Sequence, residues 1–404
     1  MLNYQYTARD NSTNKVVKST VKAESEKAAA KLLMAQGMIP LKITEQGEAK
    51  GPIEKLLNRI TTRDKVVFTR QLSTLINAGL PLAQSLRTVQ EQTENKRLKQ
   101  IVQDIITSVE GGKSLSESFG KHPKVFNDVF IALISAGEAS GTLDKALERI
   151  ANQQEKDAEI ASKVRGAMVY PVIVLVVIIL VIVFMLTTVV PQIERLYVDM
   201  RKELPFLTAM MVGAANLLVK FWWVLLILLV AAIYFAKRFI ETDSGRSFID
   251  KLKLNIPLFG VMFRKLYMAR FTRTGQTLMM TGVPMLETLN ITARAVNNVH
   301  VSAAVRRAAE KVKGGKPLSQ ALKNEEYVLS LVPQMISIGE QSGSIDGMMG
   351  KAATFYENEL DNTIKSISTA IEPILMVFLA AVAGIMVAAI LLPIYTLVSS
   401  GAIR

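Results

Sequence analysis

The chain has 404 residues, a formal net charge of +13 and no cysteine, which excludes disulfide bonds and thiolate chemistry. Half of its residues are hydrophobic although 21% are charged, so the two kinds are segregated along the sequence, as in a membrane protein with large aqueous parts. Its two histidines leave little for a metal site or a general base, so we expect no enzyme activity and no catalytic, cofactor-binding or metal-binding residues. We attribute the positive charge to the excess of Lys and Arg on the cytoplasmic side of membrane proteins, not to nucleic-acid binding.

The N-terminal 50 residues predict a small α+β module. Residues 4–8 and 16–21 flank a polar turn and have the pattern of a hairpin, and residues 39–44 predict a third short strand. Between them, residues 25–36 are rich in alanine and predict a helix that Gly37 ends.

Three runs without any charged residue, at 166–193, 221–236 and 373–403, are candidates for membrane-spanning helices. A helix needs about 20 apolar residues to cross the hydrocarbon core. The first and third runs are long enough. The second is long enough only if its helix begins near residue 217 and Lys220 extends its amine to the membrane surface. Basic residues precede the first span, follow the second and precede the third, so we expect the large segments that they border in the cytoplasm.

Much of the chain is a duplication, in which motifs recur at an offset of 203 residues that later becomes 202. Chance matches do not keep their register over such a length. The sequence therefore predicts a repeated unit, each consisting of a cytoplasmic helical bundle followed by one membrane helix. The repeated motifs are Phe-Thr-Arg at 68–70 and 271–273, Gly-x-Pro at 79–81 and 282–284, Gly-Gly-Lys at 111–113 and 314–316, and Gly-Glu-x-Ser-Gly-x-[Leu/Ile]-Asp at 137–144 and 339–346.

The predicted fold class is an all-α membrane protein with two homologous cytoplasmic helical bundles, three transmembrane helices and a small N-terminal α+β module. The middle span is needed because the second bundle has to return to the cytoplasm. The predicted segments are the α+β module at 1–50, a linker at 51–65, bundle copy 1 at 66–169, transmembrane helix 1 at 170–192, a short extracytoplasmic loop at 193–216, transmembrane helix 2 at 217–236, a cytoplasmic connector at 237–270, bundle copy 2 at 271–372, transmembrane helix 3 at 373–398 and an extracytoplasmic tail at 399–404.

The motifs fall at expected helix ends. Gly79 ends one helix and Pro81 starts the next, as Gly282 and Pro284 do in copy 2. In the longer motif, Thr142 suits the N-cap of the helix that runs into the first span. The next acidic residue, Asp144, then lies at the second helical position, near the positive helix end. The equivalent residues in copy 2 are Ser344 and Asp346.

A glutamate occupies the second position of each long motif, Glu138 in copy 1 and Glu340 in copy 2. We expect each carboxylate to accept hydrogen bonds from the N–H groups of its own Ser-Gly turn, in preference to a partner contact or a cation. The Gly-Gly-Lys-Ser segment at 111–114 lacks the earlier glycine of a phosphate-binding loop, so an interhelical turn is predicted there.

Prolines and one acid mark the start of the spans. Pro171 lies near the start of the first apolar run, and Glu372-Pro373 stands at the start of the third. We expect Glu372 at the membrane surface, and the prolines at helix starts or kinks.

This combination of motifs resembles the inner-membrane platform proteins of type IV pilus and type II secretion machines, the pilus-assembly C / general-secretion F family. The two Gly-Glu-x-Ser-Gly motifs, the paired Phe-Thr-Arg and Gly-x-Pro segments and Glu372-Pro373 carry the resemblance, which extends over residues 4–398. It implies a protein without covalent chemistry of its own. It also implies contact with a hexameric assembly ATPase, with pilin or pseudopilin subunits and with other inner-membrane assembly subunits. A homo-oligomer in the bacterial inner membrane is expected.

A small-solute transporter or channel subunit is the alternative, because transporters also use internal repeats and membrane prolines. Against it, the repeat is mostly outside the apolar runs, and those runs contain no charged residue that could bind or relay an ion. The residues expected to serve as partner contacts or structural turns are Gly79, Pro81, Gly137, Glu138, Gly141, Asp144, Gly282, Pro284, Gly339, Glu340, Gly343 and Asp346.

Overall fold

The computed structural model describes residues 2–10, 16–23, 26–35, 37–45, 58–199, 205–257 and 259–399. The chain divides into two units, which are described separately: residues 1–64 with 92–101, and residues 65–91 with 102–404.

The N-terminal segment is a three-stranded antiparallel sheet with one helix, in the strand order β2-β1-β3. The central strand β1 pairs with β2 through Tyr4 and Val21, and with β3 through Tyr6 and Ile43. The predicted hairpin, helix and third strand are thus confirmed, while the turn expected at 10–14 lies, beyond Asp10, outside the described residues. The elements are β1 (Leu2–Asp10), β2 (Val16–Ala23), α1 (Glu26–Ala35) and β3 (Met38–Glu45).

The first copy of the repeat is a bundle of helices around an aromatic core. The rings of Phe68, Phe119, Phe126 and Phe130 lie 4.5–6.3 Å apart between centroids, in edge-on or tilted arrangements that favour aromatic pairs. The helices are α3 (Thr62–Asn77), α4 (Leu82–Gln92), α5 (Lys96–Glu110), α6 (Leu115–Gly120), α7 (Asp128–Ser140) and the start of α8 (Leu143–Phe184).

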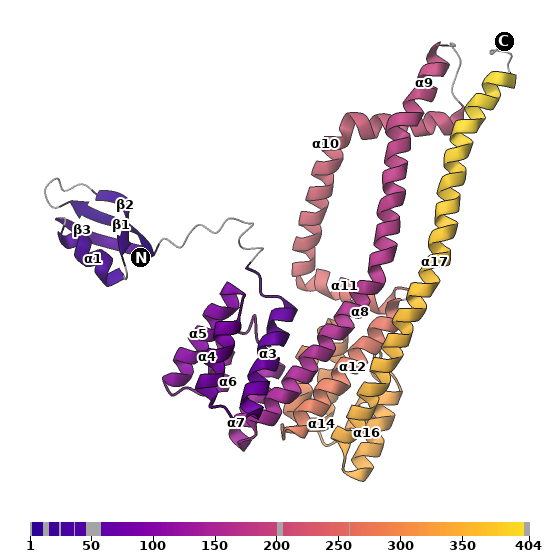
Figure 1. Ribbon diagram of the computed structural model, residues 1–404. Helices are drawn as coiled ribbons and strands as arrows, with labels where there is room; N and C mark the ends of the chain where they lie inside the picture. The colour runs from indigo at the N-terminus through magenta and orange to yellow at the C-terminus, as the bar shows by residue number, and fades with distance from the viewer. Residues whose placement is uncertain are drawn as a thin grey trace. The chain divides into compact units, whose positions relative to one another are not determined.

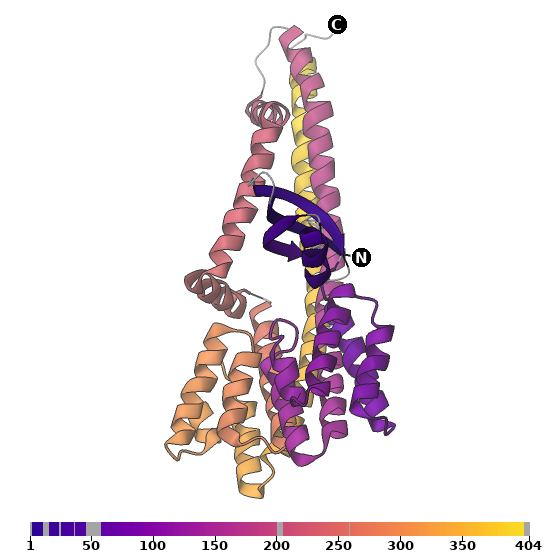
Figure 2. The ribbon, with the colours of Figure 1, turned by 90° about the vertical axis from the view of Figure 1, so that its left-hand side faces the viewer.

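The second copy begins with one additional helix and then repeats this order, and it lies beside the part of the first copy that belongs to the same unit (Figures 1 and 2). Its core is more aliphatic, with Phe271 among buried residues such as Leu289, Val305 and Ile336. The helices are α11 (Asp243–Asn255), α12 (Phe259–Met280), α13 (Met285–Ala295), α14 (Val299–Lys313), α15 (Leu318–Leu322), α16 (Leu331–Ser342) and α17 (Ile345–Ser399).

Two long helices connect the bundles to the apolar part of the chain. Helix α8 has 42 residues and α17 has 55, and both begin inside a bundle and continue into a charge-free run (Figure 1). After α8 the chain continues through a π-helical turn, η1 (Met185–Val189), into α9 (Val190–Asp199). Three helices are long and apolar enough to cross a membrane, which confirms the three predicted spans by length and composition.

Pro171 and Pro373 do not start helices, contrary to one of the expectations above. Pro171 lies inside α8 and Pro373 lies inside α17, each more than 20 residues after its helix begins. An apolar helix tolerates an internal proline when the helical segments on both sides of it are long and neighbouring groups bond the carbonyl that proline leaves without a donor. Pro191 does accompany a change in winding, because it directly follows the π-helical turn, in which the Val190 N–H donates to the Met185 carbonyl.

The segment expected as a loop at 193–216 is largely helical. Helix α9 extends to Asp199, and α10 (Phe206–Glu241) begins well before the predicted start of the second span. Leu, Met and Ala dominate residues 206–219, and these residues favour helix over loop. The first arm of α10 packs its Val212 and Ala215 onto Leu186 and Val190.

Helix α10 bends at Phe221, whose backbone angles (φ −118°, ψ 21°) are not helical, and Figure 1 shows the second arm turning away there. The bend coincides with the first residue of the charge-free run, so the second arm holds the whole apolar run from 221 to 236.

One buried carboxylate distinguishes the second bundle from the first. Glu325 follows α15 with its side chain only 5% exposed, and it accepts hydrogen bonds from Arg307 at 2.6 Å and Lys311 at 2.7 Å. At an offset of 203 residues, the first bundle has His122 in place of this glutamate and Asp104 in place of the arginine. The cluster therefore connects α14 to the chain after α15 in copy 2 only.

This cluster makes the stability of the second bundle depend on pH. Burial raises the pKa of Glu325, but the hydrogen bonds from Arg307 and Lys311 outweigh burial and lower it below the ordinary value. A carboxylate with a lowered pKa stabilises the fold above its unfolded pKa of about 4.3, and that stabilisation is lost as pH falls through the folded pKa. Glu325→Gln should lower the free energy of unfolding at neutral pH by about 1–3 kcal/mol, because it removes charged hydrogen bonds.

Hydrogen exchange of the α14 and α15 amides between neutral and acidic pH measures this effect. The protection of the natural chain should decline with acid, and Glu325→Gln should start lower and decline less. The matched control is Glu117→Gln, because Glu117 is exposed and its oxygen lies 3.5 Å from the amine of Lys113. This variant should change the protection of the amides little. An equal decline in the natural chain and in Glu325→Gln would show that another group controls the acid response.

Candidate functional site

The two Gly-Glu-x-Ser-Gly motifs form the same turn in both copies. The last glycine is the left-handed residue that ends α7 or α16, with φ of 68° at Gly141 and 69° at Gly343. The following residue donates its N–H to the carbonyl of the first glycine, from Thr142 to Gly137 and from Ser344 to Gly339, at 2.9 Å in each copy. The chain then reverses and enters the long helix α8 or α17.

The first glycine of each motif is required for a different reason, which is space. A Cβ on Gly339 would lie 2.7 Å from the Cα of Ile345, and one on Gly137 would lie 2.6 Å from the Cβ of Ala146. The start of the long helix therefore packs directly on the backbone of the preceding helix. In the sequence alone this requirement cannot be told apart from that of the turn.

The two motif glutamates bind a different helix from the one expected. Glu138 accepts hydrogen bonds from the N–H groups of Leu115 and Ser116, the latter at 2.9 Å, and from the Ser116 hydroxyl at 2.6 Å. In copy 2, Glu340 accepts from the N–H of Ser319 at 3.2 Å and from its hydroxyl at 2.5 Å. Each carboxylate thus caps the short helix that follows the Gly-Gly-Lys turn.

The prediction that these carboxylates bind their own Ser-Gly turn is wrong, and the reason is the supply of donors. The N–H groups of Gly141 and Thr142 are already bonded to carbonyls at the end of α7. The first N–H groups of α6 have no partner within their own helix and carry its positive end, so they attract the carboxylate.

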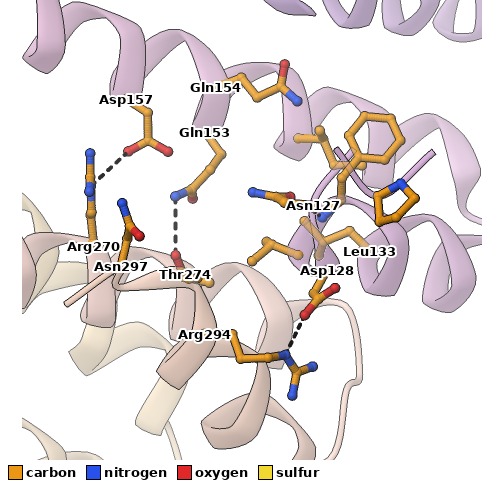
Figure 3. Close-up of a pocket in the computed structure, with 15 residues that line it drawn as sticks. Asn127, Asp128, Leu133, Gln153, Gln154, Asp157, Arg270, Thr274, Arg294 and Asn297 are labelled. Carbon is orange, nitrogen blue, oxygen red and sulfur yellow. Dashed lines mark hydrogen bonds and ion pairs between the residues drawn. The ribbon is translucent and has the colours of Figure 1, made fainter. Parts of the chain in front are cut away.

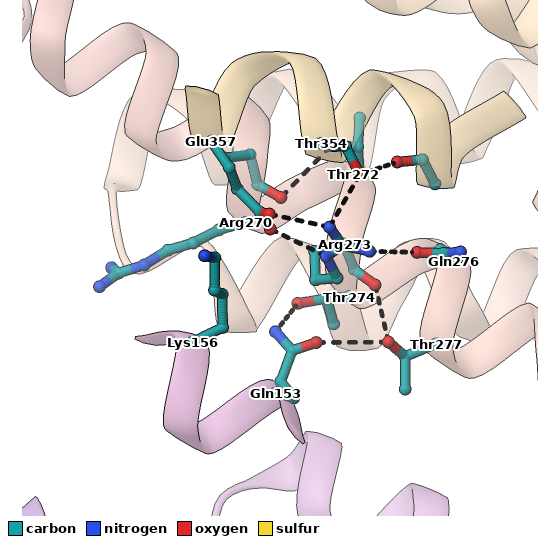
Figure 4. Close-up of polar contacts among 12 residues, drawn as sticks. Gln153, Lys156, Arg270, Thr272, Arg273, Thr274, Gln276, Thr277, Thr354 and Glu357 are labelled. Atoms are coloured by element: carbon teal, nitrogen blue, oxygen red, sulfur yellow. Dashed lines mark hydrogen bonds and ion pairs between the residues drawn. The ribbon is translucent and has the colours of Figure 1, made fainter. Parts of the chain in front are cut away.

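The Phe-Thr-Arg motifs also connect to the long helices. Arg70 donates from Nε and Nη2 to both carboxylate oxygens of Glu155, at 2.6 and 2.5 Å, and this hydrogen bond raises the pKa of Arg70. Arg273 makes the same two-pronged contact with Glu357 at 2.8 Å for both bonds (Figure 4). Each arginine also donates a third hydrogen bond, to the residue three positions before the glutamate on the long helix: Asn152 in copy 1 and Thr354 in copy 2. The arginine and glutamate motifs therefore hold each long helix to its bundle at two levels.

The remaining motif residues lie apart from these contacts. Gly79 and Gly282 have φ of 83° and 84° and sit in exposed turns, with Pro81 and Pro284 exposed at the start of the next helix. Asp144 and Asp346 lie at the second position of α8 and α17, as predicted. Thr142 is the N-cap residue, but its hydroxyl pairs with that of Ser140 at 2.7 Å and does not cap the helix.

A polar seam lies between the two bundles, and it was not predicted. A cavity of about 450 Å³ is lined by residues of α7 and α8 on one side and of α12 and α13 on the other (Figure 3). Arg294 pairs with Asp128 at one edge, and Arg270 lies 4.0 Å from Asp157 at another. Gln153 bridges the seam by hydrogen bonds to Thr274 and Thr277, at 3.4 and 3.3 Å (Figures 3 and 4). The only sequence signal was the polar series at 149, 153 and 157 on one face of α8.

The described ranges contain no group of three or more His, Asp or Glu side chains that could hold a metal ion. The repeated polar contacts each join two helices. Their carboxylates face backbone N–H groups, hydroxyls or a guanidinium, as in contacts that stabilise a fold. The arrangement suits rigid connection of bundle and long helix.

The two glycines of a motif should tolerate substitution differently. Gly339→Ala should destabilise the second bundle by several kcal/mol, because the added methyl meets the backbone of Ile345. Gly343→Ala meets open space and should cost only about 1–2 kcal/mol, the strain of a left-handed residue. Gly166→Ala in α8 also meets open space and should be neutral or stabilising, which makes it the matched control.

Thermal unfolding of the three variants in detergent measures this order. Equal losses for Gly339→Ala and Gly343→Ala would mean that the helix contact at the first glycine is not tight. Gly343→Val and Gly141→Val combine the left-handed strain with a branched side chain, and should be worse than the alanine variant.

Comparison with known proteins agrees with this repeated architecture. The family described as "Type II secretion system (T2SS), protein F" matches residues 68–191 and again residues 271–393, and the N-terminal domain of the same protein matches residues 1–44. The chain is 39% identical to a type IV pilus assembly protein PilC of Thermus thermophilus, over 98% of each chain. It is 36% identical to PilC of Myxococcus xanthus over 96% of this chain and 93% of the relative. It is 31% identical to a type II secretion system protein F of Vibrio cholerae, over 98% of each chain. The chain therefore belongs to the type II secretion system protein F family, which includes the PilC proteins of type IV pilus assembly.

Proposed function

We propose that this protein is the inner-membrane platform of a type IV pilus or type II secretion machine, and that it couples a cytoplasmic assembly ATPase to the extraction and polymerisation of pilin or pseudopilin subunits. Relatives named for both machines match almost the entire chain, including both copies of the repeat. The observation that carries the proposal is the continuity of α8 and α17, which begin at a motif turn in a bundle and run on into an apolar span. The repeated contacts argue against a solute transporter, because they lie in the bundles and not among the spans.

The bundles are proposed to lie in the cytoplasm, where an ATPase would reach them. Basic residues border the apolar runs on the bundle side, including Lys163 and Arg165 before the first run and Lys237 and Arg238 after the second, as the positive-inside rule requires for that orientation. Glu372 is then near the cytoplasmic surface of the membrane on α17, with Pro171 and Pro373 at the start of the first and third spans.

The exposed Gly-x-Pro turns are the proposed contacts for the ATPase. Gly79, Pro81, Gly282 and Pro284 are exposed; each glycine adopts the left-handed backbone without steric strain, and each proline presets φ at the start of the next helix. Glu138 and Glu340 are occupied by helix caps, so we assign them, with Gly137, Gly141, Gly339 and Gly343, to holding the bundle together. The apolar surfaces of the spans suit contact with the membrane helices of pilin, of other assembly subunits and of further copies of this chain.

A deletion strain tests this function. Surface fibres and secreted proteins should be lost while pilin or pseudopilin is still made and processed, because the subunits would stay in the membrane without extraction. Complementation with the natural chain should restore assembly, and Pro81→Ala with Pro284→Ala should restore less at an equal membrane level of the protein. Fibres and secretion that persist in the deletion strain, together with loss of uptake of a solute, would instead support the transporter.

A further inference from the structure

Apart from α8 and α17, which pack on each other further along their length, the two bundles of one chain contact each other through different faces. The first bundle uses α7 and α8, with Arg149 and Gln153 on α8 at the centre. The second uses α12 and α13: Thr274 accepts a hydrogen bond from Gln153, Thr277 donates one to Gln153, and the Met280 carbonyl accepts one from Arg149 at 2.8 Å. Since the bundles are copies of one unit, this is a head-to-tail contact, and it leaves one face of each kind unused.

The unused faces can be identified from the repeat offsets. The equivalent of the α8 face in copy 2 is on α17, and we name it the tail face: Lys351, Thr354, Phe355 and Asn358. The equivalent of the α12 face in copy 1 is on α3, and we name it the head face: Val67, Gln71, Thr74 and Asn77. All four residues of the tail face are exposed, as are Val67, Thr74 and Asn77 of the head face.

Each unused face carries an exposed hydrophobic side chain at the position of a seam residue. Phe355 is 48% exposed and takes the place of Gln153, the residue that bridges the internal seam. Val67 is 45% exposed and takes the place of Arg270, which faces Asp157 across the seam. Single exposed apolar residues are common on protein surfaces, but these two lie on the two faces that the internal contact leaves open, and an aromatic residue such as Phe355 is typical of the core of an interface.

We propose that the tail face of one chain docks on the head face of a second copy, and so continues the contact that joins the two bundles within a chain. This inference rests on the proposed homo-oligomeric platform and names its interface. Phe355 then packs over Thr74 and Val67, where Gln153 meets Thr277 in the internal seam. Lys351 takes the place of Arg149 and donates to the Asn77 carbonyl at the end of α3, as Arg149 donates to the Met280 carbonyl at the end of α12.

The direction of the long helices makes this contact compatible with a membrane. Helices α8 and α17 leave the bundles on the same side and run beside each other (Figures 1 and 2). The two bundles are therefore related by a turn about an axis that follows the spans. If a second chain repeats this contact, the spans of both chains lie on the same side of the bundles. A ring of bundles below one membrane needs that arrangement.

Cysteine cross-linking of the full-length chain in membranes tests the contact, and the absence of natural cysteine gives a clean background. Phe355→Cys combined with Thr74→Cys should form, with a short bis-maleimide, products at multiples of the chain mass. The matched control is Gln153→Cys with Thr277→Cys, which spans the equivalent internal contact and should cross-link within one chain, giving a product with the mass of one chain plus one linker.

Two results would overturn the proposal. One is the absence of intermolecular product from the 355/74 pair when the 153/277 control reacts. The other is an equal yield of dimer from Phe355→Cys alone, since it would show that two tail faces meet each other. Either result leaves the platform function standing, because that function is tested by fibre assembly in the deletion strain and not by cross-linking.

Discussion

The hydrogen bonds of two carboxylates, Glu138 and Glu340, hold the repeated part of this protein together. Each sits at the end of one helix and binds the free N–H groups at the start of another, so that three helix ends meet at one turn. The third end belongs to the long helix, which packs so closely on the first motif glycine that no Cβ fits between them. Charged hydrogen bonds to helix N-termini are among the stronger polar contacts in proteins, and here they determine where the long helix starts.

The arginine of the Phe-Thr-Arg motif fixes the direction of the same helix. Arg70 and Arg273 bind Glu155 and Glu357 more than ten residues after the turn, so each long helix is held at two points along its length. A helix held at two points behaves as a rod extending from the bundle. The 55 residues of α17 correspond to about 80 Å, enough to reach from the bundle across a membrane. A displacement of a bundle would thus be carried to the spans with little bending.

The sequence predicted the parts of the fold that depend on local pattern. The alternation in the N-terminal strands, the charge-free runs and the offset of the repeat each have a signal within a short window, and the structure contains the corresponding elements. It did not predict the partner of Glu138, because Leu115 and Ser116 are more than 20 residues away and only the fold brings their N–H groups to it. The helical form of 206–216 was missed because the prediction weighed charge and not helix propensity. The polar seam was missed because polar side chains on α8 look the same in sequence whether they face water or a second bundle.

The duplication also shows what has diverged. The motif contacts are the same in both copies, whereas the Arg307–Glu325–Lys311 cluster is present in the second alone, and the faces that remain open carry Val67 and Phe355 in place of polar residues. The internal connections are thus the same in the two bundles, whereas their surfaces differ.

The most direct measurement of the central claim is fibre assembly or secretion with the rod interrupted. Seven glycines inserted between Thr369 and Ala370 of α17, about two turns of chain, should make the connection flexible, whereas seven alanines at the same place should keep it helical and in phase. Rigid transmission predicts that assembly is lost with the glycine insertion and retained in large part with the alanine insertion, at equal membrane levels of the two proteins. Equal assembly with both insertions would contradict the account.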